Sequence, residues 1–323
     1  MRAQVSLEGV QRAREVIAEH LPRTPLIQHP LLLEETGLDL WVKHENHLPT
    51  GSFKVRGGFN FIATLPEEQR RRGIVSATRG NHGQSLALAS RTFGVRCVIV
   101  VPHGNSPEKN AAMRAFGAEL IEHGKDFDAA WEKVNALVES EGLTFVHAAN
   151  NPALINGVGT YSLEIAEDLP DIEAVLIPIG GGSAVCGTIA VFRALNPDVK
   201  IIGVQAAGAP SVHDSWKAGK ITPGAAPETF ADGLATRVPF ELPFAIITES
   251  IDDIVLVSDE EIRRAVHLLF SATHNIAEGA GAAALAGAIK LSASLKGKRV
   301  AVPLSGSNLE VSKLPWVLGE HWK

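Results

Sequence analysis

The stretch AVLIPIGGGSAVCGT (Ala174–Thr188) joins an apolar run to three consecutive glycines and then to a second apolar segment. Its first residues are typical of a strand buried on both faces of a sheet, and the residues after Ser183 are typical of a helix. Similar apolar runs alternate with helical patterns at residues 40–45, 74–78, 95–101, 118–122, 200–205, 253–258 and 299–304. This alternation predicts an α/β fold with mostly parallel sheets and with ligands at the carboxyl ends of strands.

Local signals predict where some helices begin and where the chain is irregular. Ser106 followed by Pro107 predicts an N-cap and a first helical residue, and Ser258 with Glu261 predicts a capping box. After that box, an apolar stripe is expected at Ile262, Ala265, Val266, Leu269 and Phe270. Residues 206–228 are rich in Ala, Gly and Pro, and we expect them to form a mobile surface loop.

The order of the elements predicts two domains. Residues 73–146 contain their own succession of strands and helices, so we expect a small mobile domain there, which carries the loop around Asn81. Residues 1–72 and 147–323 are expected to form a large domain together.

Composition excludes several classes of protein. The chain has 323 residues, of which 36 are acidic and 30 basic, and its formal net charge of −6 provides neither a nucleic-acid surface nor a polybasic membrane anchor. No apolar stretch resembles a signal peptide or a membrane span, so a cytoplasmic location is expected. The two cysteines, Cys97 and Cys186, exclude a disulfide framework and a CxxC metal site.

The run from Gly180 to Ser183 is a candidate anion site. Successive glycines allow backbone N–H groups to converge, and the N-terminus of the following helix adds partial positive charge. A phosphate is the natural ligand, and a plain tight turn between strand and helix is the alternative interpretation. The run is neither GxGxxG nor a Walker loop, so it supports neither a dinucleotide fingerprint nor an NTPase.

Three other segments carry chemically useful side chains. SATRGNHGQS (76–85) offers Thr78, Asn81 and His82 at a predicted helix start, although a simple helix cap explains them as well. PTGSFKVRGG (49–58) contains Lys54, which is either a solvated helix lysine or an amine able to form a Schiff base with an aldehyde. VPLSGSN (302–308) places Ser305 at the end of a strand, where its hydroxyl can hydrogen-bond a ligand ring nitrogen.

Taken in order, these segments resemble the fold type II family of pyridoxal-phosphate enzymes, in the branch of serine/threonine dehydratases (threonine ammonia-lyases) and serine racemases. The resemblance covers residues 24–308 and is carried by KHENHLPTGSFKVRGG, SATRGNHGQS, IPIGGGSAVCG, FADGLATR, DDIVLVSDEEI, AEGAGAAAL and LSGSN. It implies a two-domain, tryptophan synthase β-like fold, pyridoxal 5'-phosphate as cofactor, an amino-acid substrate and a homodimer.

The resemblance also implies a role for each matched residue. Lys54 would hold the cofactor as a Schiff base and take the Cα proton, Phe53 would pack on the cofactor ring, and Ser305 would face the ring nitrogen. Asn81 would bond the phenolic oxygen of the ring. The other implied cofactor contacts are Gly180, Gly181, Gly182, Ser183 and Ala184 around the phosphate, and Gly233 and Glu278 along the pocket. The implied substrate contacts are Ser76, Thr78, Arg79, Gly80, Asn81 and His82.

The reaction implied is removal of the β-hydroxyl and amino groups of L-threonine, L-serine or a related amino acid, giving a 2-oxo acid and ammonia. The alternatives are a 3-hydroxyaspartate dehydratase, a dehydratase of hydroxyectoine catabolism and a serine racemase. Arg79 stands where the racemase has a serine as second base, and a guanidinium stays protonated, so elimination ranks above racemisation. If Arg79 turned inward, it would instead pair with a second carboxylate on the substrate.

Two further expectations concern metals and rival classes. The cation site of the family matches Gln205, Ala209 and Ser211, which offer no carboxylate, so no metal is predicted. A nucleotide-binding oxidoreductase would need an acidic residue where the strand at 200–205 ends in Gln205. A non-catalytic amino-acid sensor would be expected to have lost Lys54, which is present.

Overall fold

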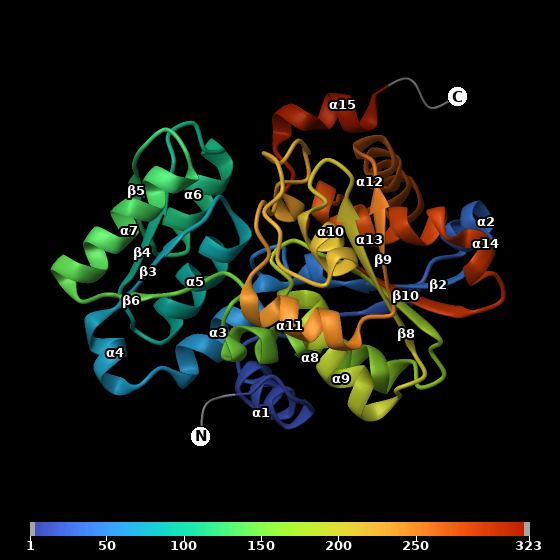
Figure 1. Cartoon of the computed structure of the whole chain (residues 1–323), viewed down its shortest axis with the longest axis horizontal. Coiled ribbons are helices and arrows are strands. Elements are labelled where there is room, and N and C mark those ends of the chain that lie inside the picture. The colour runs from blue at the N-terminus through green and yellow to red at the C-terminus, as the bar shows by residue number, and fades with distance from the viewer. Residues whose placement is uncertain (1–3, 320–323) are drawn as a thin grey trace.

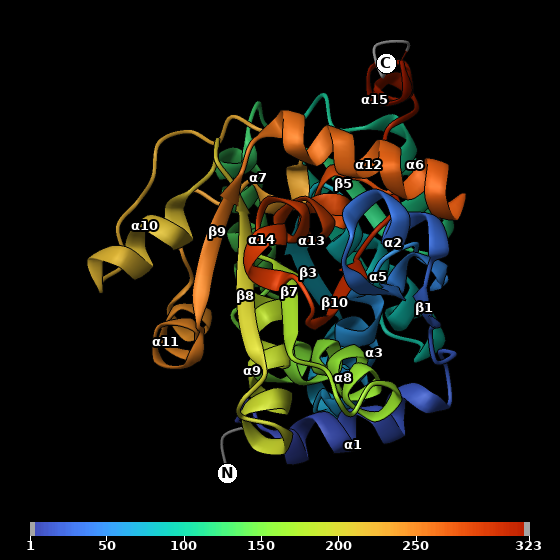
Figure 2. The same ribbon diagram turned by 90° about the vertical axis from the view of Figure 1, so that its right-hand side faces the viewer.

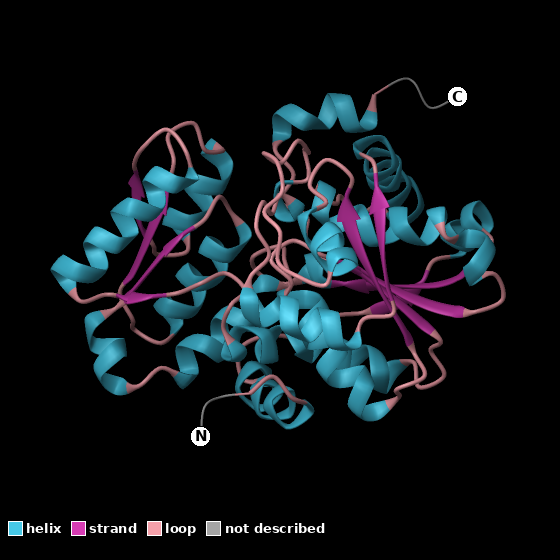
Figure 3. Ribbon diagram, in the orientation of Figure 1, coloured by secondary structure: helices cyan, strands magenta, loops and turns pink. Residues whose placement is uncertain are grey.

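The computed structural model describes residues 4–319, whose strands form two separate sheets (Figures 1 and 3). The larger sheet has the order β1-β2-β10-β7-β8-β9, in which β1 is antiparallel to β2 and all other neighbours are parallel. Its strands are β1 (Leu26–Gln28), β2 (Asp39–His44), β7 (Ala174–Pro178), β8 (Lys200–Ala206), β9 (Asp253–Val257) and β10 (Arg299–Leu304).

The smaller sheet is parallel throughout and has the order β5-β4-β3-β6. Its strands are β3 (Ile74–Ala77), β4 (Cys97–Val101), β5 (Glu119–Glu122) and β6 (Thr144–Phe145). In Figure 1 this sheet and its helices occupy the left side of the molecule, and the larger sheet occupies the right.

Helices cover both sheets, as buried parallel strands require. Figure 2 shows α1, α8 and α9 on one face of the larger sheet and α12, α13 and α14 on the other. The helices are α1 (Leu7–Ala18), α2 (Pro30–Thr36), α3 (Lys54–Thr64), α4 (Glu67–Arg72), α5 (Asn81–Thr92), α6 (Pro107–Ala115), α7 (Phe127–Glu141), α8 (Pro152–Asp168), α9 (Ser183–Leu195), α10 (Ser211–Ala218), α11 (Glu241–Ser250), α12 (Asp259–Thr273), α13 (Gly279–Lys290), α14 (Ser292–Leu295) and α15 (Leu314–Leu318), with short 3-10 turns η1 (Glu45–His47), η2 (Asp232–Leu234) and η3 (Val311–Lys313).

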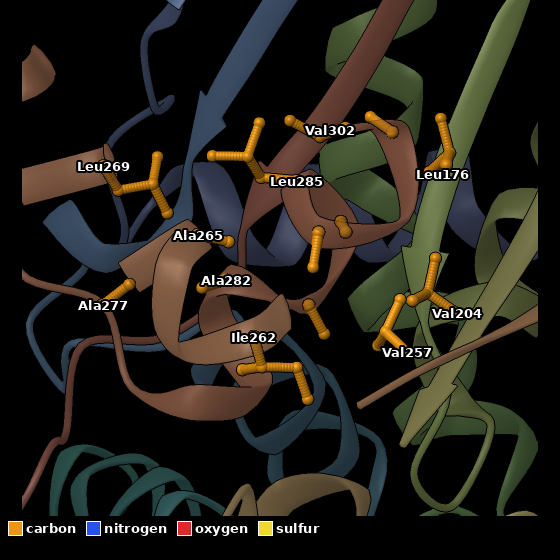
Figure 4. Close-up of a cluster of buried hydrophobic side chains, with 14 of the residues drawn as sticks. Leu176, Val204, Val257, Ile262, Ala265, Leu269, Ala277, Ala282, Leu285 and Val302 are labelled. Carbon is orange, nitrogen blue, oxygen red and sulfur yellow. The ribbon is translucent and has the colours of Figure 1, made fainter. Parts of the chain in front are cut away.

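A large apolar core lies between α12, α13 and the larger sheet (Figure 4). The alanine-rich helix α13 is almost wholly buried because its small side chains allow close approach to both the strands and α12. Leu285 from α13 and Val302 from β10 are both 1% exposed in this core. This packing holds the end of β10, and therefore Ser305, in a rigid setting.

The predicted strands and helix starts agree with the structure within about two residues, with β1 and β6 missed. These two strands have three and two residues, which is too short for a pattern to reveal. Ser106 caps α6, and the capping box of Ser258 and Glu261 is complete. Phe270 is 41% exposed, against the prediction, because eight residues of α-helix place it about 80° around the axis from Ile262.

The prediction of an irregular loop over residues 206–228 was wrong for its middle part. Helix α10 begins directly after Pro210 and ends at Gly219, which has a left-handed conformation with φ of 66°. Its inward face buries Val212 and Ser215. The flanking residues are rich in Ala, Gly and Pro, which favour irregular structure. The sequence therefore did not indicate the short amphipathic helix between Pro210 and Gly219.

Candidate active site

The loop before α3 is fastened to the segment that follows β10. Ser52 and Gly306 form an antiparallel bridge, and the backbone N–H of Phe53 donates to the carbonyl of Ser305 at 3.1 Å. The amide of Asn308 donates to the carbonyl of Thr50 at 2.9 Å. Lys54, the first residue of α3, therefore begins its helix beside the carboxyl end of the larger sheet.

The Lys54 amine reaches the glycine loop on the other side. Its Nζ donates to Oγ of Ser183, the first residue of α9, at 3.1 Å. Burial lowers the pKa of Lys54 to about 8, and the carboxylate of Glu278 opposes that shift. Phe53 is buried beside this amine, with its ring centroid 5.0 Å from Nζ. With a pKa this close to neutral pH, a fraction of the amine is deprotonated there and can act as a nucleophile and a base.

The glycine loop has the geometry of an anion cradle. A Cβ on Gly180 would lie 2.0 Å from the carbonyl oxygen of Gly233, and Gly182 has φ of +93°, so neither position tolerates a side chain. No side chain caps the N-terminus of α9, which leaves the N–H groups of Ser183 and Ala184 for a ligand. The cradle and the Lys54 amine next to it suit a phosphorylated aldehyde such as pyridoxal phosphate.

Asn81 connects the two sheets through its side-chain amide. Its Nδ2 donates to Oε1 of Glu278 at 2.5 Å, and its Oδ1 accepts from Nδ2 of Asn308 at 2.7 Å. Burial raises the pKa of Glu278, with the nearby Lys109 charge opposing. Sequence analysis gave no role to Asn308, although it ends the LSGSN motif. Asn81 bonds both Glu278 and Asn308, and Asn308 lies only three residues after Ser305. The structure therefore brings Asn81, Glu278 and Ser305 close together.

The predicted substrate residues differ in their surroundings. Thr78 and His82 are buried, and Ser76 is buried and donates to the carbonyl of Val146 at 2.8 Å. The side chain of Arg79 is exposed, while its backbone carbonyl accepts from the amide of Asn105 at 3.2 Å. Gly80 precedes α5, whose N-terminus has no side-chain cap. The roles of these residues in substrate binding remain predictions.

His147 lies near Lys54 and was missed by sequence analysis. Its Nδ1 accepts the backbone N–H groups of Ala149 and Asn150 at 3.1 and 3.0 Å, so the ring carries its proton on Nε2. Burial, with a contribution from the Lys54 charge, lowers the pKa of His147 to about 4. The residue follows β6, and without that two-residue strand the sequence gives no signal that would place it here.

Lys109 is a second residue that the sequence did not reveal. It belongs to α6 beside the smaller sheet, and its Nζ lies 3.1 Å from Oδ2 of Asp232 and 3.7 Å from Oε1 of Glu310. Both carboxylates belong to the part of the chain that surrounds the larger sheet. Lys109 itself is 9% exposed, whereas the Asp232 side chain is 40% exposed, so a buried amine and a half-exposed carboxylate form this ion pair between the two halves of the molecule.

Comparison with known proteins places this site in a family. Residues 17–306 match the family model described as "Pyridoxal-phosphate dependent enzyme". The chain is 39% identical to the L-threonine ammonia-lyase of Thermotoga maritima, over 98% of this chain and 79% of that protein. It is 34% identical to the serine racemase of Dictyostelium discoideum, over 98% of both. A solved structure of processed threonine deaminase isoform 2 from Solanum lycopersicum matches with a TM-score of 0.91 and 33% identity, over 98% of this chain and 89% of that one.

The chain therefore belongs to the pyridoxal-phosphate-dependent enzyme family. The predicted family, its fold type, its cofactor and the class of a pyridoxal-phosphate-dependent lyase are confirmed by these matches. Within residues 4–319, no helix is both long and apolar enough to cross a membrane. The same part of the chain contains no group of three or more His, Cys, Asp or Glu side chains arranged to hold a metal ion.

Proposed function

We propose that this protein is an ammonia-lyase that removes the β-hydroxyl and amino groups of L-threonine, L-serine or a related β-hydroxy amino acid. The products are a 2-oxo acid and ammonia. The observation that carries the proposal is the Lys54 amine, which lies 3.1 Å from Ser183 at the anion cradle and whose pKa is lowered to about 8. The names of the relatives in Thermotoga and Solanum describe the same reaction class.

Bound pyridoxal phosphate supplies an electron-withdrawing ring that acidifies the Cα proton of an amino acid. Gly180, Gly181, Gly182, Ser183 and Ala184 would hold its phosphate, Phe53 and Ser305 its ring, and Lys54 its aldehyde. The lowered pKa allows Lys54 to accept and return a proton near neutral pH, which suits it to act as the base at Cα.

The substrate carboxylate is assigned to the N-terminus of α5. This helix begins at Asn81 without a side-chain cap, so its first backbone N–H groups are available to an anion, and the helix dipole favours negative charge there. Thr78 provides a buried hydroxyl at the same loop.

The position of Arg79 favours elimination over racemisation. An exposed guanidinium that stays protonated is a poor second base for Cα. Its exposure also favours serine or threonine over 3-hydroxyaspartate, because Arg79 is directed to solvent. If Arg79→Ala abolished turnover of 3-hydroxyaspartate while preserving that of serine, the hydroxyaspartate alternative would take precedence.

A substrate screen on the purified, cofactor-loaded protein tests the proposal. Ammonia and a 2-oxo acid are expected from L-threonine or L-serine, and neither is expected from the Lys54→Ala variant. Chiral analysis of residual serine separates the racemase alternative, since a racemase would accumulate D-serine. Absence of any 2-oxo acid from every β-hydroxy amino acid tried, with cofactor bound, would contradict the proposal.

We also propose that residues 73–146 form a small domain that closes over the substrate. The ion pair of Lys109 with Asp232 and the hydrogen bonds of Asn81 are the contacts that would hold the closed state. A Lys109→Ala variant is expected to raise KM more than it lowers kcat. An unchanged KM would contradict this role.

The oligomeric state and the cellular location of the protein are also proposals. We propose a cytoplasmic homodimer that binds neither nucleic acid nor membrane, in line with the net charge of −6 and the family resemblance. Light scattering is expected to give about twice the chain mass of 34.3 kDa. A mass equal to one chain would contradict the homodimer.

A further inference from the structure

His82 contains a buried polar atom that has no partner in the described protein. The residue lies in the first turn of α5, directly after Asn81, and is 5% exposed. Its Nε2 is buried and has no hydrogen-bond partner among residues 4–319. Buried polar atoms are nearly always paired, and an unpaired one is costly unless a ligand supplies the missing partner.

The surroundings of the ring determine which of its nitrogens carries the hydrogen. The carbonyl of Val146 accepts a hydrogen bond from the ring, and because Nε2 has no partner, this bond comes from Nδ1. A neutral imidazole protonated at Nδ1 presents a bare lone pair at Nε2. Burial, reinforced by the nearby Lys54 charge, lowers the pKa of His82 to about 3, so the ring stays neutral and is a weak base. Nε2 is therefore suited to accept a hydrogen bond and poorly suited to take a proton.

The same surroundings indicate where this lone pair lies. Lys54 and His147 are the titratable groups that act on the ring of His82, and both border the proposed cofactor site. His147 has the opposite tautomer and presents an N–H group at Nε2. The two histidines near Lys54 thus offer one hydrogen-bond acceptor and one donor.

A β-hydroxy amino acid has only one group that suits a bare acceptor. Its carboxylate carries no hydrogen and would be repelled by a lone pair, and its amine is occupied with the cofactor aldehyde. The β-hydroxyl alone remains free to donate. We propose that Nε2 of His82 accepts a hydrogen bond from the substrate β-hydroxyl, making His82 a residue that selects β-hydroxy amino acids and fixes the rotation about Cα–Cβ. The hydroxyl oxygen then keeps its lone pairs free for the proton that it needs in order to leave as water.

This inference rests on the proposed function, and two substrates test it separately. L-Serine and β-chloro-L-alanine share the carboxylate, the amine and the Cα proton, but the chloro compound has no hydroxyl hydrogen to donate. In His82→Asn, the shorter amide can still donate to the Val146 carbonyl, whereas the acceptor at the ε position is lost. In the matched variant His82→Gln, an amide oxygen returns to about that position.

The measured quantity is the ratio of kcat/KM for L-serine to that for β-chloro-L-alanine. His82→Asn is expected to lower this ratio at least about tenfold, as loss of one buried hydrogen bond predicts, and His82→Gln is expected to restore part of it. An unchanged ratio in His82→Asn, whether both substrates lose activity equally or neither does, would overturn the inference. If the wild-type protein with bound cofactor makes no 2-oxo acid from serine or threonine, the proposed function itself fails.

A second readout does not depend on activity. Histidine ¹⁵N NMR of the cofactor-free protein, assigned by comparison with His82→Asn, is expected to show an unprotonated Nε2 and a hydrogen on Nδ1 near pH 7. A hydrogen on Nε2, or a doubly protonated ring at that pH, would overturn the inference. Thermal unfolding of each variant verifies that the comparison is made on folded protein.

Discussion

Two cations two residues apart in α3 have opposite surroundings. Arg56 is 0% exposed, and its guanidinium lies 2.7 Å from Glu45 and 2.6 Å from Glu164. Although burial opposes the charge of Arg56, these two carboxylates outweigh it and raise its pKa. Lys54 has no carboxylate within ion-pair distance in the described part of the chain, and burial lowers its pKa to about 8.

The difference follows from helix geometry. It shows that a single turn of helix can contribute both to the stability of the fold and to the chemistry of the site. Residues i and i+2 point about 200° apart around a helix, so Lys54 faces the anion cradle while Arg56 faces α8. A paired buried charge is fixed and inert, whereas an unpaired one is destabilised and therefore reactive. The cluster of Arg56, Glu45 and Glu164 thus anchors the helix that presents Lys54.

The largest effect is expected from removing the reactive cation. Lys54→Ala should lower turnover at least about a thousandfold, because the variant loses both the covalent anchor and the Cα base. It should unfold at nearly the wild-type urea concentration, since Lys54 makes no ion pair. Steady-state assays and urea denaturation check both parts, with the exposed Lys296→Ala as control. Substantial activity in Lys54→Ala would contradict the reactive role of Lys54, and with it the difference in role between Lys54 and Arg56.

Removing the paired cation should act on stability instead. Arg56→Met leaves the buried carboxylate of Glu45 without its ion-pair partner and leaves Glu164 paired with Lys43 alone, so it should lower the free energy of unfolding by about 3–5 kcal/mol. Arg14→Met, which breaks an exposed pair with Glu167, is the matched control and should cost less than about 1 kcal/mol. Equal costs for the two variants, measured by urea denaturation, would contradict the structural role of the Arg56 cluster.

The Glu278 carboxylate provides a smaller effect, which is a shift in the pKa of Lys54. An amine attacks an aldehyde only when it is deprotonated, so the rate at which pyridoxal phosphate reacts with cofactor-free protein should rise with pH around a midpoint near 8. Because the Glu278 carboxylate raises the pKa of Lys54, Glu278→Gln should move the midpoint to lower pH. Glu310→Gln serves as control, and a midpoint that rises in Glu278→Gln would contradict the account.

The smallest effect is expected at the edge of the Arg56 cluster. Nη1 of Arg56 donates to Oγ1 of Thr160 at 3.2 Å, which is one of several bonds that satisfy the guanidinium. Thr160→Val should lower the free energy of unfolding by about 1 kcal/mol and leave the pH midpoint of Lys54 unchanged. A shift of that midpoint would mean that the two cations are coupled more closely than their separate surroundings indicate.

Much of the fold was predictable because long buried strands and capped helices leave local signals. The glycine loop, the loop around Asn81 and the segment after β10 were all recognised from their order along the chain. Local patterns could not reveal His147, Lys109 or the pairing of Asn308 with Asn81, because each depends on segments far apart in sequence. The Arg56 cluster was missed for the same reason, since its two glutamates come from different elements.

The identity of the reactive lysine is the central claim, and borohydride trapping tests it most directly. Reduction of the cofactor-loaded protein should fix the pyridoxyl group to one lysine, which peptide mass spectrometry can locate. We predict that the modified residue is Lys54 and that the Lys54→Ala protein gives no stoichiometric label. A pyridoxyl group found stoichiometrically on any other lysine would contradict the account.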